Sequence, residues 1–184
     1  VSAAEGTRKL ELTLGPGEVK SGVRVDLAGK ITVRGTVVDV EAHVAQGLPH
    51  FAIGGMPDAA CAQAPDRVRS AAATSGVPVP AHRVTVNLSP ASIPKRGACF
   101  DLLIAVAVLS AAGVIKGGVA RDVVHLGELA LDGRVRGVHG VLPAVLAAAR
   151  AGARHVVVPV ENVGEAQLVD GVTVHGAGCL RDVV

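Results

Sequence analysis

The chain has 184 residues and a formal net charge of +2, enough for one domain with a sizeable core, alone or with a short appendage. Hydrophobic residues make up 49% of it, yet it has only two Phe and no Tyr or Trp, which predicts a core of Val, Ala, Leu and Ile. The mild charge and the scarcity of aromatic rings give no sign by themselves of nucleic-acid binding, which relies on phosphate contacts and stacking platforms.

The cysteines and histidines form no pattern typical of a disulfide framework or a metal site. Cys61, Cys99 and Cys179 are scattered and odd in number, which indicates reduced thiols in a cytoplasmic protein. The seven histidines include no pair at metal-ligand spacing, so neither a metal nor another cofactor is expected. The apolar run at 102–115 is shorter than the roughly 18 residues of a membrane span. We therefore expect a cytoplasmic protein with no membrane partner.

The N-terminal region has the alternating pattern of β-strands. "KLELTLG" and "GVRVDL" flank "GPGEVKS", so residues 1–30 are expected to form an extension with a β-hairpin. The following stretch, "KITVRGTVVDVEAHVAQGLPHFAIGGMP", is rich in β-branched residues and is broken by glycine and proline. It predicts at least two further strands before the first helix.

The middle of the chain predicts two helices around one strand. Asp58 is expected to cap a helix that ends at Gly76, with a kink or a later start at Pro65. "RVTVNLS" at 83–89 alternates like a strand, and the apolar residues from about 100 to 112 predict a central buried helix.

The last third predicts a hairpin, two helical segments and two strands. In "VVHLGELALDGRVRGV" the Asp132-Gly133 pair predicts a type I′ turn between two strands. "LPAVLAAARAGA" reads as a helix with Pro143 in its first turn, and "HVVVP" and "VTVHG" read as strands. Between them, Asn162 is expected to cap a short helix, with Glu165 completing a capping box. Together these elements predict an α+β fold, a mixed sheet with helices packed on it.

Five stretches of the chain together form a specific pattern: "VVDVEAHVAQGLPHFAIGGMPDAA", "DRVRSAAATSG", "RVTVNLSPASIPKRGACFDLLIAVAVL", "GELALDGRVRGVHGVLPAVLAA" and "VVVPVEN". In this order they resemble the amino-terminal domain of the ComM (YifB) magnesium-chelatase-like family of AAA+ proteins. The resemblance covers residues 31–184, which it marks as one domain. It implies a two-layer α/β sandwich of the type shared by the Lon proteolytic domain and domain 2 of a small-subunit ribosomal protein.

The resemblance also implies a role inside a larger protein. In the family an ATPase module follows this domain, and members act in DNA processing as branch-migration helicases of natural transformation. The chain starts at Val1 rather than Met and ends on "CLRDVV", so we expect it to be a piece of something longer. It has no GxxxxGK[ST] motif, and Pro65 replaces the helix former usual in the family. The chain alone is therefore not expected to hydrolyse ATP.

In Lon proteases a serine after a "PKDGP" turn is the nucleophile, and a lysine in a later "GGLKEK" segment is its base. The resemblance puts Cys99 of "PKRGAC" at the nucleophile position and Leu142 of "HGVLPAV" at the base position. Leucine cannot accept a proton, so the dyad is incomplete. A histidine base, His139 or His125, would restore it. Otherwise Cys99 is a small residue packed at a helix start.

Three pairs of basic residues are candidates for an interaction surface. They are Arg67 and Arg69, Lys95 and Arg96, and Arg134 and Arg136. In "RVR" on a strand both arginines would face the same side. Such a face fits a solvated surface, a contact with the ATPase module or another subunit of a ring, or DNA phosphates.

The sequence therefore favours a non-catalytic accessory domain of a ComM-like ATPase. One alternative is a Lon-fold thiol hydrolase that uses Cys99 with a histidine base. The other is a standalone nucleic-acid-binding module.

Overall fold

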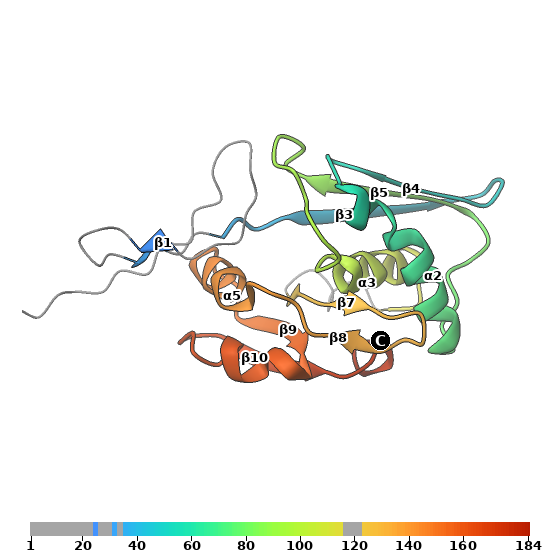
Figure 1. The fold of residues 1–184 in the computed structure, drawn as a ribbon. Helices are drawn as coiled ribbons and strands as arrows, with labels where there is room; N and C mark the ends of the chain where they lie inside the picture. The colour runs from blue at the N-terminus through green and yellow to red at the C-terminus, as the bar shows by residue number, and fades with distance from the viewer. Residues whose placement is uncertain (1–23, 26–30, 33–34, 116–122) are drawn as a thin grey trace, which may run out of the picture.

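The described part of the structure, which is a computed structural model, contains two three-stranded sheets, two pairs of short strands and the helices (Figure 1). It describes residues 24–25, 31–32, 35–115 and 123–184. This mixture of helices and sheets confirms the predicted α+β class. No helix in these ranges is long and apolar enough to cross a membrane.

The first sheet is built around β5 (Arg83–Ser89), which lies between β3 (Asp39–Ala45) and β4 (His50–Gly54). β5 pairs antiparallel with β3 and parallel with β4. Its residues alternate between exposed and buried, and Val84, Val86 and Leu88 are fully buried. The period of two in "RVTVNLS" therefore sets the face that packs on the helices, as the sequence predicts.

The predicted helix after Asp58 is divided into α1 (Ala59–Ala62) and α2 (Ala64–Thr74). Asp58 caps α1 by accepting a hydrogen bond from the Cys61 N–H at 2.8 Å. Pro65 lies in the first turn of α2, where its missing N–H leaves no helical bond unmade. Gly76, with φ at +79°, follows the end of α2. The predicted cap, break and stop are thus confirmed.

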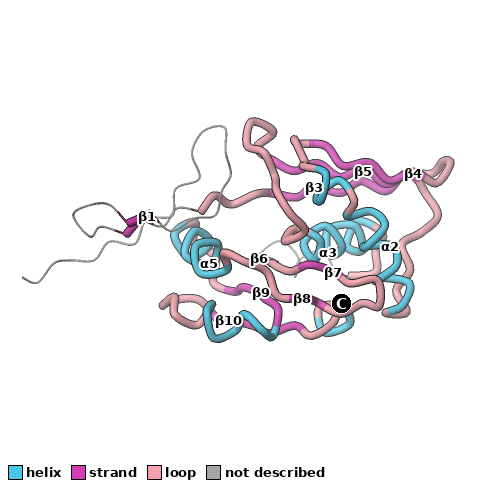
Figure 2. Tube along the Cα trace, in the orientation of Figure 1, coloured by secondary structure: helices cyan, strands magenta, loops and turns pink. Residues whose placement is uncertain are grey.

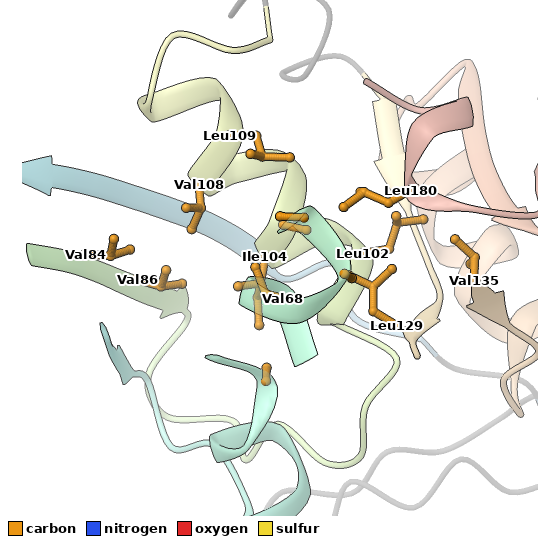
Figure 3. Packing of buried hydrophobic residues seen from close by; sticks show 14 of the residues in the cluster. Val68, Val84, Val86, Leu102, Ile104, Val108, Leu109, Leu129, Val135 and Leu180 are labelled. Atoms are coloured by element: carbon orange, nitrogen blue, oxygen red, sulfur yellow. The ribbon is translucent and has the colours of Figure 1, made fainter. Parts of the chain in front are cut away.

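The central helix, α3 (Asp101–Ala111), is apolar on nearly all sides and lies in the middle of the molecule (Figure 2). It contacts β3 and β5 on one side and β6 and β7 on the other. Figure 3 shows Ile104 and Val108 near Val84 and Val86 of β5, while Leu102 lies toward Leu129 and Leu180. A helix buried between two layers needs no polar stripe, which explains its composition.

The second sheet consists of three parallel strands in the order β10-β9-β6. Their bounds are β6 (Val123–His125), β9 (His155–Pro159) and β10 (Thr173–Ala177). A second apolar cluster joins this sheet to α5 (Val141–Arg150) and α6 (Val163–Ala166). The short helical turns η1 (Val160–Asn162) and η2 (Leu180–Asp182) follow β9 and β10.

The Asp132-Gly133 hairpin forms, but its turn is not type I′. β7 (Glu128–Leu129) pairs antiparallel with β8 (Val135–Arg136). The Ala130 N–H donates to the Arg134 carbonyl, and the Gly133 N–H donates to the Ala130 carbonyl. Only Gly133 has a positive φ, whereas type I′ requires two such residues. The loop therefore has three residues, with Gly133 in the left-handed position.

Part of the predicted N-terminal hairpin lies outside the described residues, since "KLELTLG" falls at 9–15. From "GVRVDL", β1 (Arg24–Val25) pairs antiparallel with β2 (Ile31–Thr32). The boundary between an extension at 1–30 and a domain at 31–184 stays a prediction.

Candidate functional site

The "PKRGAC" segment is held in place by backbone pairing and by one carboxylate. The Lys95 N–H donates to the Met56 carbonyl at 3.0 Å, and its carbonyl accepts from the Asp58 N–H at 2.8 Å. Both carboxylate oxygens of Asp58 accept from the Gly97 N–H, at 3.0 and 3.2 Å. Asp58 therefore joins the cap of α1 to the loop that carries Cys99, a role that its position in the sequence does not reveal.

Lys95 is not part of an exposed basic surface, so this element of the predicted interaction set is wrong. Its side chain is only 1% exposed, and its ammonium donates to the Pro90 carbonyl. Burial lowers the pKa of Lys95. The proline turn folds the lysine inward, where it ties the ends of the 90–95 loop together.

Cys99 lies just before α3 and is half-buried. Its sulfur lies 3.8 Å from the Arg96 carbonyl oxygen, and the Gly127 N–H donates to its backbone carbonyl. Burial raises the pKa of the Cys99 thiol to about 12, and nearby acidic groups act in the same direction. A nucleophilic cysteine needs the opposite shift, toward the thiolate.

The structure brings Cys99 and His139 to one cavity of about 480 Å³, which we call the Cys99 cavity. Glu128 and Arg96 also line it. The other proposed base, His125, lines a different cavity of about 770 Å³. Leu142 is absent from the described lining residues of both cavities, and its side chain packs against the second apolar cluster. Of Leu142 and the two alternative bases His139 and His125, only His139 lines the same cavity as Cys99.

The wall of the Cys99 cavity that carries His139 is held by three side chains after β9. Glu161 accepts from the Gly137 N–H at 3.0 Å, and Glu165 accepts from the Leu142 N–H at 2.9 Å. Asn162 accepts from the Val138 N–H at 2.9 Å and donates to the Val138 carbonyl at 3.1 Å.

The capping box predicted at Asn162 is therefore wrong, because its side chain makes no cap bond to α6. The "VENVGE" pattern does indicate that a carboxylate and an amide in this segment form hydrogen bonds with backbone groups. It does not reveal that these partners lie 23 or 24 residues earlier, in the loop before α5 and in its first turn.

Arg67 is committed to an internal ion pair. Its Nε and Nη2 bond the two carboxylate oxygens of Asp101 at 2.6 and 2.9 Å, and Nη2 also donates to the Ala60 carbonyl at 2.8 Å. Asp101 is fully buried and also accepts from the Leu129 N–H at 3.2 Å. The Asp101 carboxylate raises the pKa of Arg67, which therefore stays charged. This pair links α2, α3 and β7 and is not free to bind a partner.

The other basic residues remain at the surface. Arg69 lies over the Phe51 ring, with 5.6 Å between the guanidinium carbon and the ring centre. Arg134 and Arg136 are exposed on either side of buried Val135, so they share a face as predicted. Arg134 bonds Asp132 at 2.8 Å, and Arg136 is in register with Glu128. Arg96 is also exposed. Of the six predicted residues, Lys95 is buried, Arg67 and Arg69 are half-buried, and Arg96, Arg134 and Arg136 are exposed.

In the described part of the chain no group of three or more His, Cys, Asp or Glu side chains is placed to hold a metal ion.

The chain is similar to several known proteins over most of its length. Residues 40–162 match the protein family described as subunit ChlI of Mg-chelatase. An uncharacterized protein of Mycobacterium tuberculosis is 49% identical over 146 residues, which is 79% of this chain and 29% of that protein. The competence protein ComM of Haemophilus influenzae is 41% identical over 152 residues, covering 83% and 30%.

The uncharacterized protein YifB of Escherichia coli is 38% identical over 143 residues, covering 78% of this chain and 27% of that protein. The chain thus matches less than a third of the length of each of these relatives.

Proposed function

Because the chain belongs to the family of the Mg-chelatase subunit ChlI, and to its ComM/YifB group, we propose that it serves as a non-catalytic accessory domain of a ComM-like AAA+ ATPase. The proposal rests above all on the Cys99 cavity. The residue at the nucleophile position is a thiol whose pKa is raised to about 12, and the residue at the base position packs in the core. A cavity with a protonated thiol at the nucleophile position and a leucine at the base position lacks the activated nucleophile that covalent catalysis needs.

The proposed partners are the ATPase module of the same protein or neighbouring subunits of a ring, acting in DNA processing. The length of the relatives supports this context, since ComM of H. influenzae is far longer than the matched segment. Direct contact with DNA is a weaker part of the proposal. Of the six predicted basic residues, Lys95 is buried and Arg67 is bound to Asp101, which leaves few cations for phosphates.

The first experiment is to measure the size of the endogenous protein in its source cells by immunoblot, with an antibody raised against this chain. We expect a band that exceeds 18.4 kDa by an ATPase module, roughly 200–300 further residues. A band at 18.4 kDa would overturn the ATPase context.

If the band is larger, the same protein with Cys99→Ala provides the second test. ATP hydrolysis and DNA branch migration should be unchanged, because an accessory domain supplies contact rather than chemistry. A loss of more than tenfold in either activity, with native folding by circular dichroism, would contradict a non-catalytic role.

One observation favours the thiol hydrolase as a second candidate, namely that Cys99 and His139 line the same cavity. This candidate requires His139 to deprotonate Cys99, although burial raises the pKa of the Cys99 thiol. The alkylation experiment described below decides between the two.

A further inference from the structure

Among the described residues, each of the two three-stranded sheets has a terminal strand that pairs on one edge alone. Among the described residues β3 pairs only with β5, and β6 pairs only with β9. A terminal strand presents a row of backbone N–H and C=O groups that have no partner within the sheet. These two edges belong to different sheets, yet both border one space.

That space is the cavity of about 770 Å³, which we call the β3–β6 cavity. Residues 36–42 line it on the β3 side and residues 123–126 on the β6 side. Apolar residues of α3 and α5 line it as well, including Leu103, Val106 and Ala148. An extended segment placed here would lie between two strand edges and over two helices.

His125 adds an unsatisfied polar atom to the same cavity. It lines the cavity and is 4% exposed, and its Nδ1 has no hydrogen-bond partner within the ranges that the structure describes. A buried polar atom without a partner costs free energy, so native proteins usually provide one. A backbone or side-chain group of an inserted segment would do so.

The charges along β3 indicate which kind of peptide segment would fit the β3–β6 cavity. Asp39 and Glu41 are exposed and line the cavity, while Val38, Val40 and Ala42 alternate with them and are half-buried. The described lining residues include no Lys or Arg. Side chains of neighbouring strands face each other in pairs, so the complementary strand has basic residues beside the carboxylates and apolar residues beside the valines.

We propose that the β3–β6 cavity is the docking site for one extended segment of a partner protein, with alternating apolar and basic residues, which adds a strand to both sheet edges. The main-chain bonds give affinity, and the alternation gives register and selectivity. The inference rests on the proposed function, because it gives an accessory domain the contact through which it acts. The acidic rim also makes this cavity unsuited to nucleic acid.

The test uses the whole 184-residue chain and an acetylated, amidated peptide of seven residues, Lys-Val-Lys-Val-Lys-Val-Lys, matched to the seven residues of β3. We expect saturable shifts of the backbone amide NMR signals of both β3 and β6, and of the His125 ring nitrogens. The same peptide with alternate backbone nitrogens methylated is the key control. It keeps the charge but cannot pair on one edge, so its binding should be at least tenfold weaker.

A double variant tests the charge. Asp39→Asn with Glu41→Gln should lower the affinity for the peptide about threefold to tenfold, as expected for exposed cross-strand charge pairs. It should also reduce the effect of salt on peptide binding. The matched control is Asp66→Asn with Asp170→Asn, two exposed carboxylates outside the lining of the cavity.

Equal binding of the methylated peptide, or shifts confined to one strand, would overturn the proposal. Concentration-dependent shifts of β3 and β6 without peptide would identify a second copy as the occupant and would overturn it too. The immunoblot tests the proposed function separately, so the two can fail independently.

Discussion

At the scale of single residues, the strongest prediction about stability concerns the ion pair between half-buried Arg67 and buried Asp101. Asp101 is fully buried and takes its hydrogen bonds from Arg67 and from the Leu129 N–H. Arg67→Leu leaves the carboxylate without its cation, which should reduce the free energy of unfolding by about 3–5 kcal/mol. Urea unfolding followed by circular dichroism measures the change.

Arg69→Leu is the matched control, on the same helix and two residues away. Among the described residues it removes the contact with the Phe51 ring, so a loss of about 0.5–1 kcal/mol in the free energy of unfolding is expected. Similar decreases in the free energy of unfolding for both variants would show that the ion pair of Arg67 and Asp101 contributes no more than a surface contact.

Cys99 should react slowly with iodoacetamide because its pKa is raised to about 12 from an ordinary value of 9.0. Only the thiolate attacks, so between pH 6 and 9 its rate should be about a thousandfold below that of a free thiol. Mass spectrometry of the alkylated peptides separates Cys99 from Cys61 and Cys179. Alkylation of Cys99 at pH 6 faster than that of Cys179 would revive the thiol hydrolase.

His125 makes the fold sensitive to mild acid. Burial lowers its pKa to about 4 from 6.5, so the unfolded chain binds more protons than the native one between these values. This contribution to stability is present above pH 6.5 and is lost as pH falls toward 4, by about 3 kcal/mol. His125→Leu should lose less stability than the wild type between pH 7 and 4 in urea unfolding. An identical pH dependence for both would contradict the assignment.

At the scale of elements, the start of α5 depends on side chains from a distant segment. Asn162 serves both the N–H and the carbonyl of Val138. Asn162→Ala leaves these groups without partners, at a cost of about 1–3 kcal/mol. Hydrogen exchange should become faster in residues 137–142 and stay unchanged in α3.

Gln167→Ala is the control for this loop. Gln167 is exposed, and no described hydrogen bond involves its side chain, so exchange at 137–142 should not change. Equal exchange in Asn162→Ala and wild type would show that other contacts hold the loop.

Elements with strong local signals were predictable from the sequence. The Asp58 cap, the break at Pro65 and the alternation of β5 each depend on neighbours in the chain. The turn at Gly133 and the side chain of Asn162 differ from prediction for one reason. Several local geometries fit the same residues, and contacts across the molecule select among them.

At the scale of the whole molecule, the chain is expected to hydrolyse no ATP by itself. The sequence lacks the GxxxxGK[ST] loop that cradles nucleotide phosphates. Phosphate release by the purified chain should equal that of buffer, with or without DNA. Phosphate release above the buffer level would contradict this expectation if it increases with protein concentration and persists in Cys99→Ala. It would mean that the chain has a nucleotide site that its sequence does not reveal.

By itself the sequence determined the fold class, the family and the order of most elements. Alternation, capping residues, proline and glycine act over a few residues, and these signals survive without tertiary contacts. The prediction that Leu142 occupies the base position of the resemblance also comes from the sequence alone, since leucine cannot accept a proton.

Only the tertiary structure decided which charged residues are free and which potential partners meet. It buried Lys95, paired Arg67 with Asp101, placed Cys99 and His139 in the lining of one cavity and placed His125 in the lining of another. Among the described residues it also placed one unpaired edge of β3 and one of β6 beside the same cavity. The physical reason is that burial and pairing depend on residues tens of positions away, and no local pattern in the chain specifies those contacts.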